Sequence, residues 1–198
     1  MEKLMSLATQ LSRYSLRFGG TLVLLAALLI GVDVILRKFF QSSIGGADEL
    51  AGYALALGTS WSLGATLLDR AHIRIDSLYS LFPRGFRLFL DFIGLILFLS
   101  FFGLVAWRGL SVMEQSWVSS SRSHTALATP LIIPQSIWVI GLLILIFLGI
   151  ILFVRAALLV WQGEIAAASR AISTRAAAEE VEEEVRYLKE RKSKRMES

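Results

Sequence analysis

The sequence predicts an all-α integral membrane protein with four transmembrane helices. Hydrophobic residues make up 55% of the 198-residue chain, and the mean hydropathy is +0.63. Soluble domains are about 45–50% apolar, and their apolar residues are dispersed by the period of each element. Here the apolar residues gather into four blocks, each long enough for a helix that crosses a bilayer. The predicted spans cover residues 19–39, 50–68, 87–112 and 136–161.

Composition argues against several classes of site. The chain has no cysteine, which excludes a disulfide framework and a thiolate metal site, and it has only two histidines. Its net charge of +4 comes from basic residues that flank the apolar blocks or lie in the tail, and no nucleic-acid motif accompanies them. No phosphate loop or nucleophile with a nearby base is evident. We therefore expect no enzyme activity, no metal or cofactor and no nucleic-acid partner.

Residues 1–18 are predicted to form an interfacial amphipathic helix that lies flat before the first span. One helical stripe carries Leu4, Leu7, Leu11, Tyr14 and Phe18, and the basic residues lie away from it. A cleaved signal peptide is the competing interpretation, but no clear small-x-small cleavage site follows the apolar run. We expect the helix to be retained.

The first span carries one acid before its end, Asp33. An acid inside a membrane is a candidate functional group. However, Asp33 is near the outer end of the span and Arg37 lies one turn further on, so a water-accessible ion pair at i,i+4 accounts for both residues. The alternative is that Asp33 is the coupling acid of a small oligomeric cation-coupled exporter.

Small residues recur at four-residue spacing along the second span. They form two neighbouring rows, one of Gly52, Ala56, Ser60 and Gly64 and one of Ala54, Gly58 and Ser62. Because lipid is as apolar as the side chains, membrane helices associate by close packing, which small residues allow. We expect this helix to be a packing surface, either for helices of this chain or for a partner.

Charged residues bracket the same span. Asp48 and Glu49 precede it, where acids favour the positive end of the helix dipole, and a contact from Glu49 to a partner is the alternative. Five ionisable residues follow it within eight positions: Asp69, Arg70, His72, Arg74 and Asp76. Their mixed signs predict a structural network that holds the loop between the second and third spans, with a solvated loop as the simpler alternative. A metal site at His72 is disfavoured, because His124 is predicted on the opposite side of the membrane.

The third span ends near Arg108, which can snorkel towards the interface, while Trp107 and Trp117 are typical of an aromatic belt at the outer face. The connector over residues 114–133 is rich in Ser and Thr. It is either a surface for a soluble partner or a passive loop. A charged tail over residues 162–198 follows the fourth span.

The distribution of basic residues predicts the orientation. Sixteen of the 20 Lys and Arg residues lie in the N-terminal segment, the second loop and the tail, and four lie in the other two loops. The positive-inside rule therefore places both termini in the cytoplasm. Without the tail the ratio is seven to four, which agrees in sign.

These features resemble a known family, the small membrane subunit of tripartite ATP-independent periplasmic (TRAP) transporters. An acid that opens the second span and a following tyrosine, Glu49 and Tyr53, are similar to the family pattern. The most specific piece is the run Arg70-Ala71-His72-Ile73-Arg74-Ile75-Asp76, which resembles the family's loop signature. Pro134 before the last apolar run is a weaker match. The resemblance covers about residues 17–161 and leaves the tail unexplained.

The resemblance implies a function that composition does not. Such transporters take up organic acids such as dicarboxylates, sialic acid or other sugar acids across the bacterial inner membrane. A periplasmic binding protein captures the substrate, and a large permease subunit carries it, driven by a sodium gradient. The small subunit has no transport site of its own and acts as a scaffold beside the large subunit. Besides the exporter, a membrane anchor for a soluble enzyme, tethered through the tail, remains an alternative.

Overall fold

The computed structural model describes residues 2–69 and 82–172 and consists of helices joined by loops. The helices are α1 (Glu2–Phe40), α2 (Ala47–Leu68), α4 (Arg84–Val118), α5 (Ile132–Trp161) and α6 (Ile165–Ile172). No strand occurs in this part of the chain, which holds one isolated bridge between Arg122 and Pro130. The prediction of an all-α protein is confirmed.

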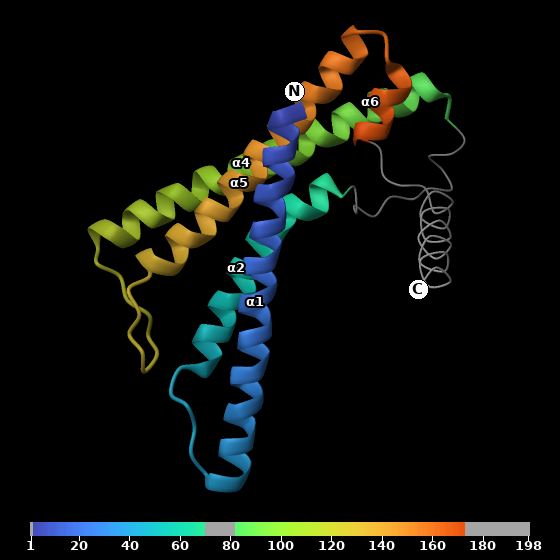
Figure 1. Ribbon diagram of the computed structural model, residues 1–198. Coiled ribbons are helices and arrows are strands. Elements are labelled where there is room, and N and C mark those ends of the chain that lie inside the picture. Colours follow the sequence, from blue (N-terminus) through green and yellow to red (C-terminus); the bar gives the residue numbers. More distant parts are fainter. Residues whose placement is uncertain (1, 70–81, 173–198) are drawn as a thin grey trace, which may run out of the picture.

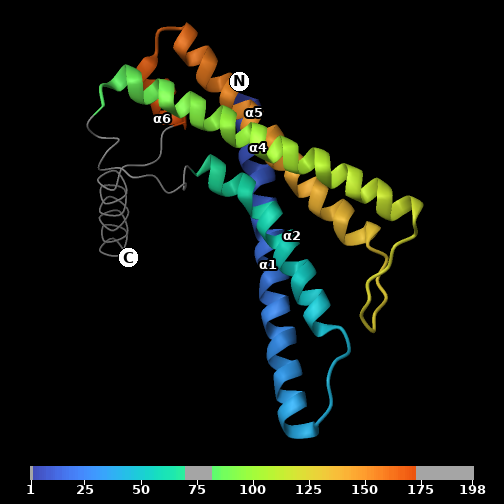
Figure 2. The ribbon, with the colours of Figure 1, turned by 180° about the vertical axis from the view of Figure 1, so that it is seen from behind.

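The helices form two pairs. Figures 1 and 2 show α1 beside α2 and α4 beside α5, with the two pairs diverging from a shared region near the N-terminus of α1. Contacts between α2 and α5 join the pairs, and α6 folds back against α5 and α4. The segment between α2 and α4 lies largely outside the described residues.

α5 is the central helix of the arrangement. Its side chains Leu145, Leu148 and Ala156 are completely buried in contacts with the neighbouring helices. Ala168 of α6 and Leu95 of α4 are buried in one apolar cluster with Leu145 and Ala156. α5 is the most apolar of the described helices, so other helices can cover it on several faces.

The predicted interfacial helix is not separate from the first span, because α1 runs without a break from Glu2 to Phe40. At 1.5 Å per residue, its 39 residues extend about 58 Å, which is roughly twice the apolar thickness of a bilayer. The predicted stripe points largely outward, with Leu7 and Tyr14 exposed. Small residues of α1 face the protein instead: Ala8, Ser12, Ser15 and Gly19 are buried. Ala8 packs against Leu148 and Ile151 of α5.

Three of the described helices are long and apolar enough to cross a membrane, namely α1, α4 and α5. α2 is not among them, because glycine, serine and threonine lower the hydropathy of its 22 residues. The prediction of four spans is therefore only partly confirmed. Glycine and serine residues that lower the hydropathy of α2 belong to the small residues that were predicted to make it a packing surface.

Candidate interaction site at the interhelical loops

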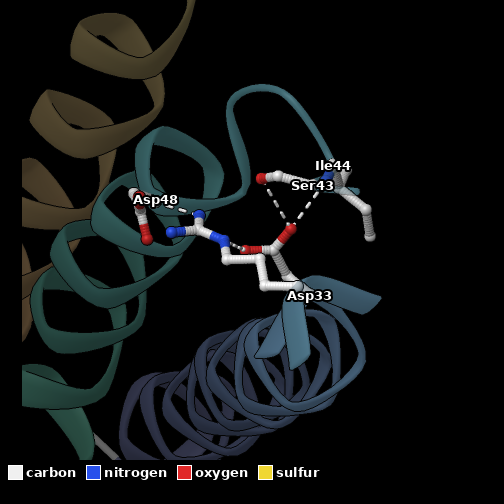
Figure 3. A network of polar contacts seen from close by, with 5 residues as sticks. Asp33, Ser43, Ile44 and Asp48 are labelled. Carbon is white, nitrogen blue, oxygen red and sulfur yellow. Dashed lines mark hydrogen bonds and ion pairs between the residues drawn. The ribbon is translucent and has the colours of Figure 1, made fainter. Parts of the chain in front are cut away.

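The loop between α1 and α2 is organised around the carboxylate of Asp33, as Figure 3 shows. Oδ1 of Asp33 accepts hydrogen bonds from the backbone N–H of Ile44 at 2.6 Å and from the hydroxyl of Ser43 at 3.0 Å. Oδ2 pairs with Nε of Arg37 at 2.6 Å, and Nη2 of Arg37 reaches Asp48 at 3.4 Å. One carboxylate thus ties the last turns of α1 to the loop and, through Arg37, to the first turn of α2.

The predicted ion pair between Asp33 and Arg37 is present, but it is not water-accessible on both sides. Only 3% of the Asp33 side chain is exposed, against 51% for Arg37 and 81% for Asp48. The sequence spacing gave the i,i+4 contact directly. It did not reveal that the chain folds back over Asp33 after a left-handed turn at Gln41, whose φ is 52°.

The two interhelical loops touch one another. Gly46, with φ of 92°, leaves room for Leu127 from the connector between α4 and α5: a Cβ on Gly46 would lie 2.5 Å from that side chain. At Gly45 a Cβ would lie 3.5 Å from Cβ of Ala126, an ordinary contact distance. Gly46 is thus needed both for the turn and for the close approach.

The connector between α4 and α5 is a small folded hairpin. Its two sides are joined by hydrogen bonds from the backbone N–H of Ser123 to Thr129 at 2.9 Å and from Leu131 to Ser121 at 3.0 Å. The guanidinium of Arg122 donates to the carbonyl of Ala128 at 3.2 Å. A hairpin held in this way can present Leu127 to Gly46 in one position.

Glu49 connects α2 to this hairpin. The hydroxyl of Tyr53 donates to Oε1 of Glu49 at 2.7 Å, while the buried Oε2 has no hydrogen-bond partner among the described residues. Burial raises the pKa of Glu49, but the hydroxyls of Tyr53, Ser123 and Thr129 lower the pKa by more, so it lies below its ordinary value of 4.5. The carboxylate is therefore charged at neutral pH and lies against the hydroxyls of the hairpin.

The small residues of α2 contact two different helices. A Cβ on Gly58 would lie 2.5 Å from Val23 and 3.0 Å from the carbonyl oxygen of Gly19, both in α1. A Cβ on Gly64 would lie 2.6 Å from Leu148 of α5. Both glycines therefore serve packing within this chain.

Other residues of the two rows differ in burial. Ala54 and Ser60 are buried, and Ser60 Oγ would be 2.7 Å from a Cβ on Gly141 of α5. By contrast, Gly52 and Ala56 are exposed, and a Cβ on Gly52 would meet nothing within 4 Å. The end of α2 nearest the interhelical loops thus keeps an uncovered strip of small residues.

Trp61 holds three helices together, which the sequence did not reveal. Its indole N–H donates to the carbonyl oxygen of Ile137 in α5 at 2.9 Å, and its ring packs at a tilt against Phe18 of α1 with centroids 4.6 Å apart. Gly141 makes room for the ring, because a Cβ there would lie 2.6 Å from Trp61. A tryptophan in the middle of a row of small residues was the available signal.

Two other sequence predictions concern charged groups. The predicted network of Arg70, His72, Arg74 and Asp76 lies outside the described residues. Within residues 2–69 and 82–172, no group of three or more His, Asp or Glu side chains is placed to hold a metal ion.

A comparison with protein families identifies the family of the chain. Residues 26–159 match the model of the DctQ component of tripartite ATP-independent periplasmic transporters. This chain belongs to that family. The match begins within α1 and ends within α5, so it includes both helix pairs and both loops. No curated protein and no solved structure matches the chain significantly.

Membership of the DctQ family makes the chain a small membrane subunit of a TRAP transporter and a multi-pass membrane protein. The family is a transporter component and not an enzyme family. A tripartite system has two further members, a large permease and a substrate-binding protein. The loop site and the exposed strip on α2 are therefore of interest as contact surfaces.

Proposed function

We propose that this chain is the non-catalytic scaffold of the large permease subunit in a bacterial inner membrane. The complete transporter would take up organic acids, such as dicarboxylates, sialic acid or sugar acids, with sodium. The periplasmic binding protein would deliver the substrate. The observation that carries the proposal is the family match over residues 26–159, which covers α1, α2, α4 and α5.

In this proposal all four long helices cross the membrane, with both termini in the cytoplasm. The arrangement of the ends supports a common side for the two described helix ends, and the distribution of basic residues supports the cytoplasm as that side. The loops over residues 41–46 and 119–131 meet at one end, whereas the N-terminal part of α1 and α6 both pack against the second half of α5. α2 can cross despite its low hydropathy, because its polar small residues are largely shielded by α1 and α5.

The close helix packing and the exposed apolar surfaces of the chain support a scaffold role. The moving part of a permease needs a fixed frame, and helices packed through glycine contacts make a stiff one. Leu24, Leu28 and Val32 form an exposed apolar face along α1. This face and the strip at Gly52 and Ala56 are available to lipid and to the large subunit, and the loop site is available to the binding protein.

The contacts of Asp33 favour the scaffold over the exporter. Its carboxylate already accepts two hydrogen bonds and pairs with Arg37. A coupling acid must release and rebind a cation during transport, which would undo the loop at every cycle. We therefore assign Asp33 to loop structure.

Reconstituted uptake tests the proposal. Proteoliposomes with the large subunit, the binding protein and this chain should accumulate an organic acid only with an inward sodium gradient, and omission of this chain should abolish uptake. Transport by this chain alone, lost in Asp33→Asn, would instead establish the exporter.

A further inference from the structure

A groove between α4 and α5 is not used by any contact described so far. Its volume is about 510 Å³, and its walls are almost wholly apolar. The residues that matter for its chemistry are Phe101, Leu104, Val105 and Arg108 of α4 and Gln135 and Trp138 of α5. A cation and an amide thus lie in an otherwise apolar trough.

The groove follows the axis of α4. Its α4 residues recur at i, i+3, i+4 and i+7, so they share one face of the helix. Gly109 brings α5 close at its floor, since a Cβ there would lie 2.8 Å from the ring of Trp138. The trough is therefore elongated and shaped for a chain that lies along the helix.

Arg108 marks the polar end of this trough. The 16 residues before it, 92–107, carry no charge, so Arg108 lies where the apolar run of α4 stops. It is exposed and has no ion pair or hydrogen bond within the described part of the chain. In the orientation proposed above, it lies at the depth of phospholipid phosphates in the outer leaflet.

Gln135, which also lines the groove, supplies a hydrogen-bond acceptor. Its Oε1 is buried and accepts no hydrogen bond from any described residue. A buried acceptor without a donor is unfavourable, so a donor from a bound molecule would stabilise it. The site thus offers a cation for an anion and an acceptor for a donor, beside an apolar channel.

We propose that this groove binds one glycerophospholipid whose headgroup carries a hydrogen-bond donor, such as phosphatidylethanolamine. The phosphate pairs with Arg108, the ammonium donates to Gln135 Oε1, and an acyl chain lies along Phe101, Leu104 and Val105. A partner helix would fill the apolar part but needs an acid placed opposite Arg108. The inference requires membrane placement in the orientation proposed above, and it does not require the scaffold role.

Lipid titration of the delipidated full chain, followed by native mass spectrometry, tests the inference. The probes are phosphatidylethanolamine, phosphatidylcholine and diacylglycerol with identical acyl chains. Phosphatidylcholine lacks only the N–H donor, so it should bind about tenfold more weakly than phosphatidylethanolamine, as expected for one lost charge-assisted hydrogen bond. Diacylglycerol lacks both the phosphate and the ammonium, so it should bind more weakly than phosphatidylcholine. Equal binding of all three lipids would mean ordinary boundary lipid and would overturn the proposal.

Variants separate the parts of the site. Arg108→Gln should lower phosphatidylethanolamine binding about tenfold, while Arg108→Lys retains most of it. Gln135→Leu should abolish the preference over phosphatidylcholine. Leu104→Trp should block the groove, whereas Leu110→Trp, an exposed position outside it, is the matched control.

Two further measurements are the melting temperature of each variant and the lipid content of the complex with the large subunit. A melting temperature within the range of the control variant shows that a loss of lipid is not a loss of fold. In the complex with the large subunit, retained phosphatidylethanolamine supports the site. A complex without this lipid, in which Arg108 cross-links to the large subunit, shows that a partner helix occupies the groove and overturns the inference.

Discussion

Single carboxylates at the loop end of the molecule differ sharply in their surroundings. Asp33 is almost completely buried and accepts hydrogen bonds from a loop N–H and a hydroxyl, whereas Asp48 is 81% exposed and touches Arg37 only at 3.4 Å. Both interact with the same arginine. The physical difference between them is the number of loop donors that each one satisfies.

Asp33→Asn should therefore destabilise the fold more than Asp48→Asn. Loss of the charge weakens the bonds from Ile44 and Ser43 and removes the pair with Arg37, which should cost about 1.5–3 kcal/mol, the range for hydrogen bonds to charged groups. Asp48→Asn should cost less than about 1 kcal/mol, as exposed ion pairs do. Thermal unfolding in detergent compares the two variants. Equal stability of both, with uptake lost only in Asp33→Asn, would contradict a structural role.

Glu49 gives the loop site a dependence on pH. Because its pKa is lowered in the folded chain, the charged form contributes stability that is present above the ordinary value of 4.5 and is lost as the pH falls through the lower folded value. Melting temperatures between pH 6 and pH 3 should therefore fall more steeply in the parent than in Glu49→Gln. Glu114→Gln, on an exposed part of α4, is the control. Parallel curves for parent and Glu49→Gln would refute this contribution.

At the scale of helices, α2 is held on two sides through its glycines. Leucine at Gly58 would collide with the backbone of α1, and leucine at Gly64 with Leu148 of α5. Both Gly58→Leu and Gly64→Leu should lower stability by about 1–3 kcal/mol or more, as overpacking does, while membrane insertion continues.

Gly52→Leu is the matched control for these variants, because no atom lies within 4 Å of the added Cβ. It should leave the stability of the isolated chain unchanged. If the exposed strip meets the large subunit, the same change should reduce co-purification with that subunit. Undisturbed stability of Gly58→Leu and Gly64→Leu would mean that α1 and α5 do not approach α2 closely.

Much of the helix arrangement could be predicted from the sequence, and the features that could not be predicted have physical causes. Hydropathy predicted the apolar blocks, and four-residue spacing predicted that Gly58 and Gly64 lie on packing faces. The break expected after residue 18 does not occur, although Gly19 and Gly20 follow it, because the close approach of Gly19 to Gly58 of α2 is made within a continuous helix. The contact of Leu127 with Gly46 joins positions far apart in the chain, so no local pattern could predict it.

At the scale of the whole molecule, the proposed four-span topology requires α2 to cross the membrane. The chain has no cysteine, so single cysteines at Ser42 and Asp69, on either side of α2, can be labelled without background. We expect an impermeant thiol reagent to label Ser42→Cys in intact spheroplasts and Asp69→Cys only after lysis. Labelling of both positions from the same side would show that α2 does not span the bilayer, and the four-span topology would be wrong.

The most direct measurement is a pull-down of the tagged chain from its native membrane in mild detergent, with mass spectrometry of the proteins that remain bound. The central claim is that this DctQ-family chain is a scaffold for a large permease. The account predicts a large hydrophobic permease in stoichiometric amount. Recovery of the chain alone, as a homo-oligomer, would contradict the scaffold and make Asp33 the first residue to test for transport.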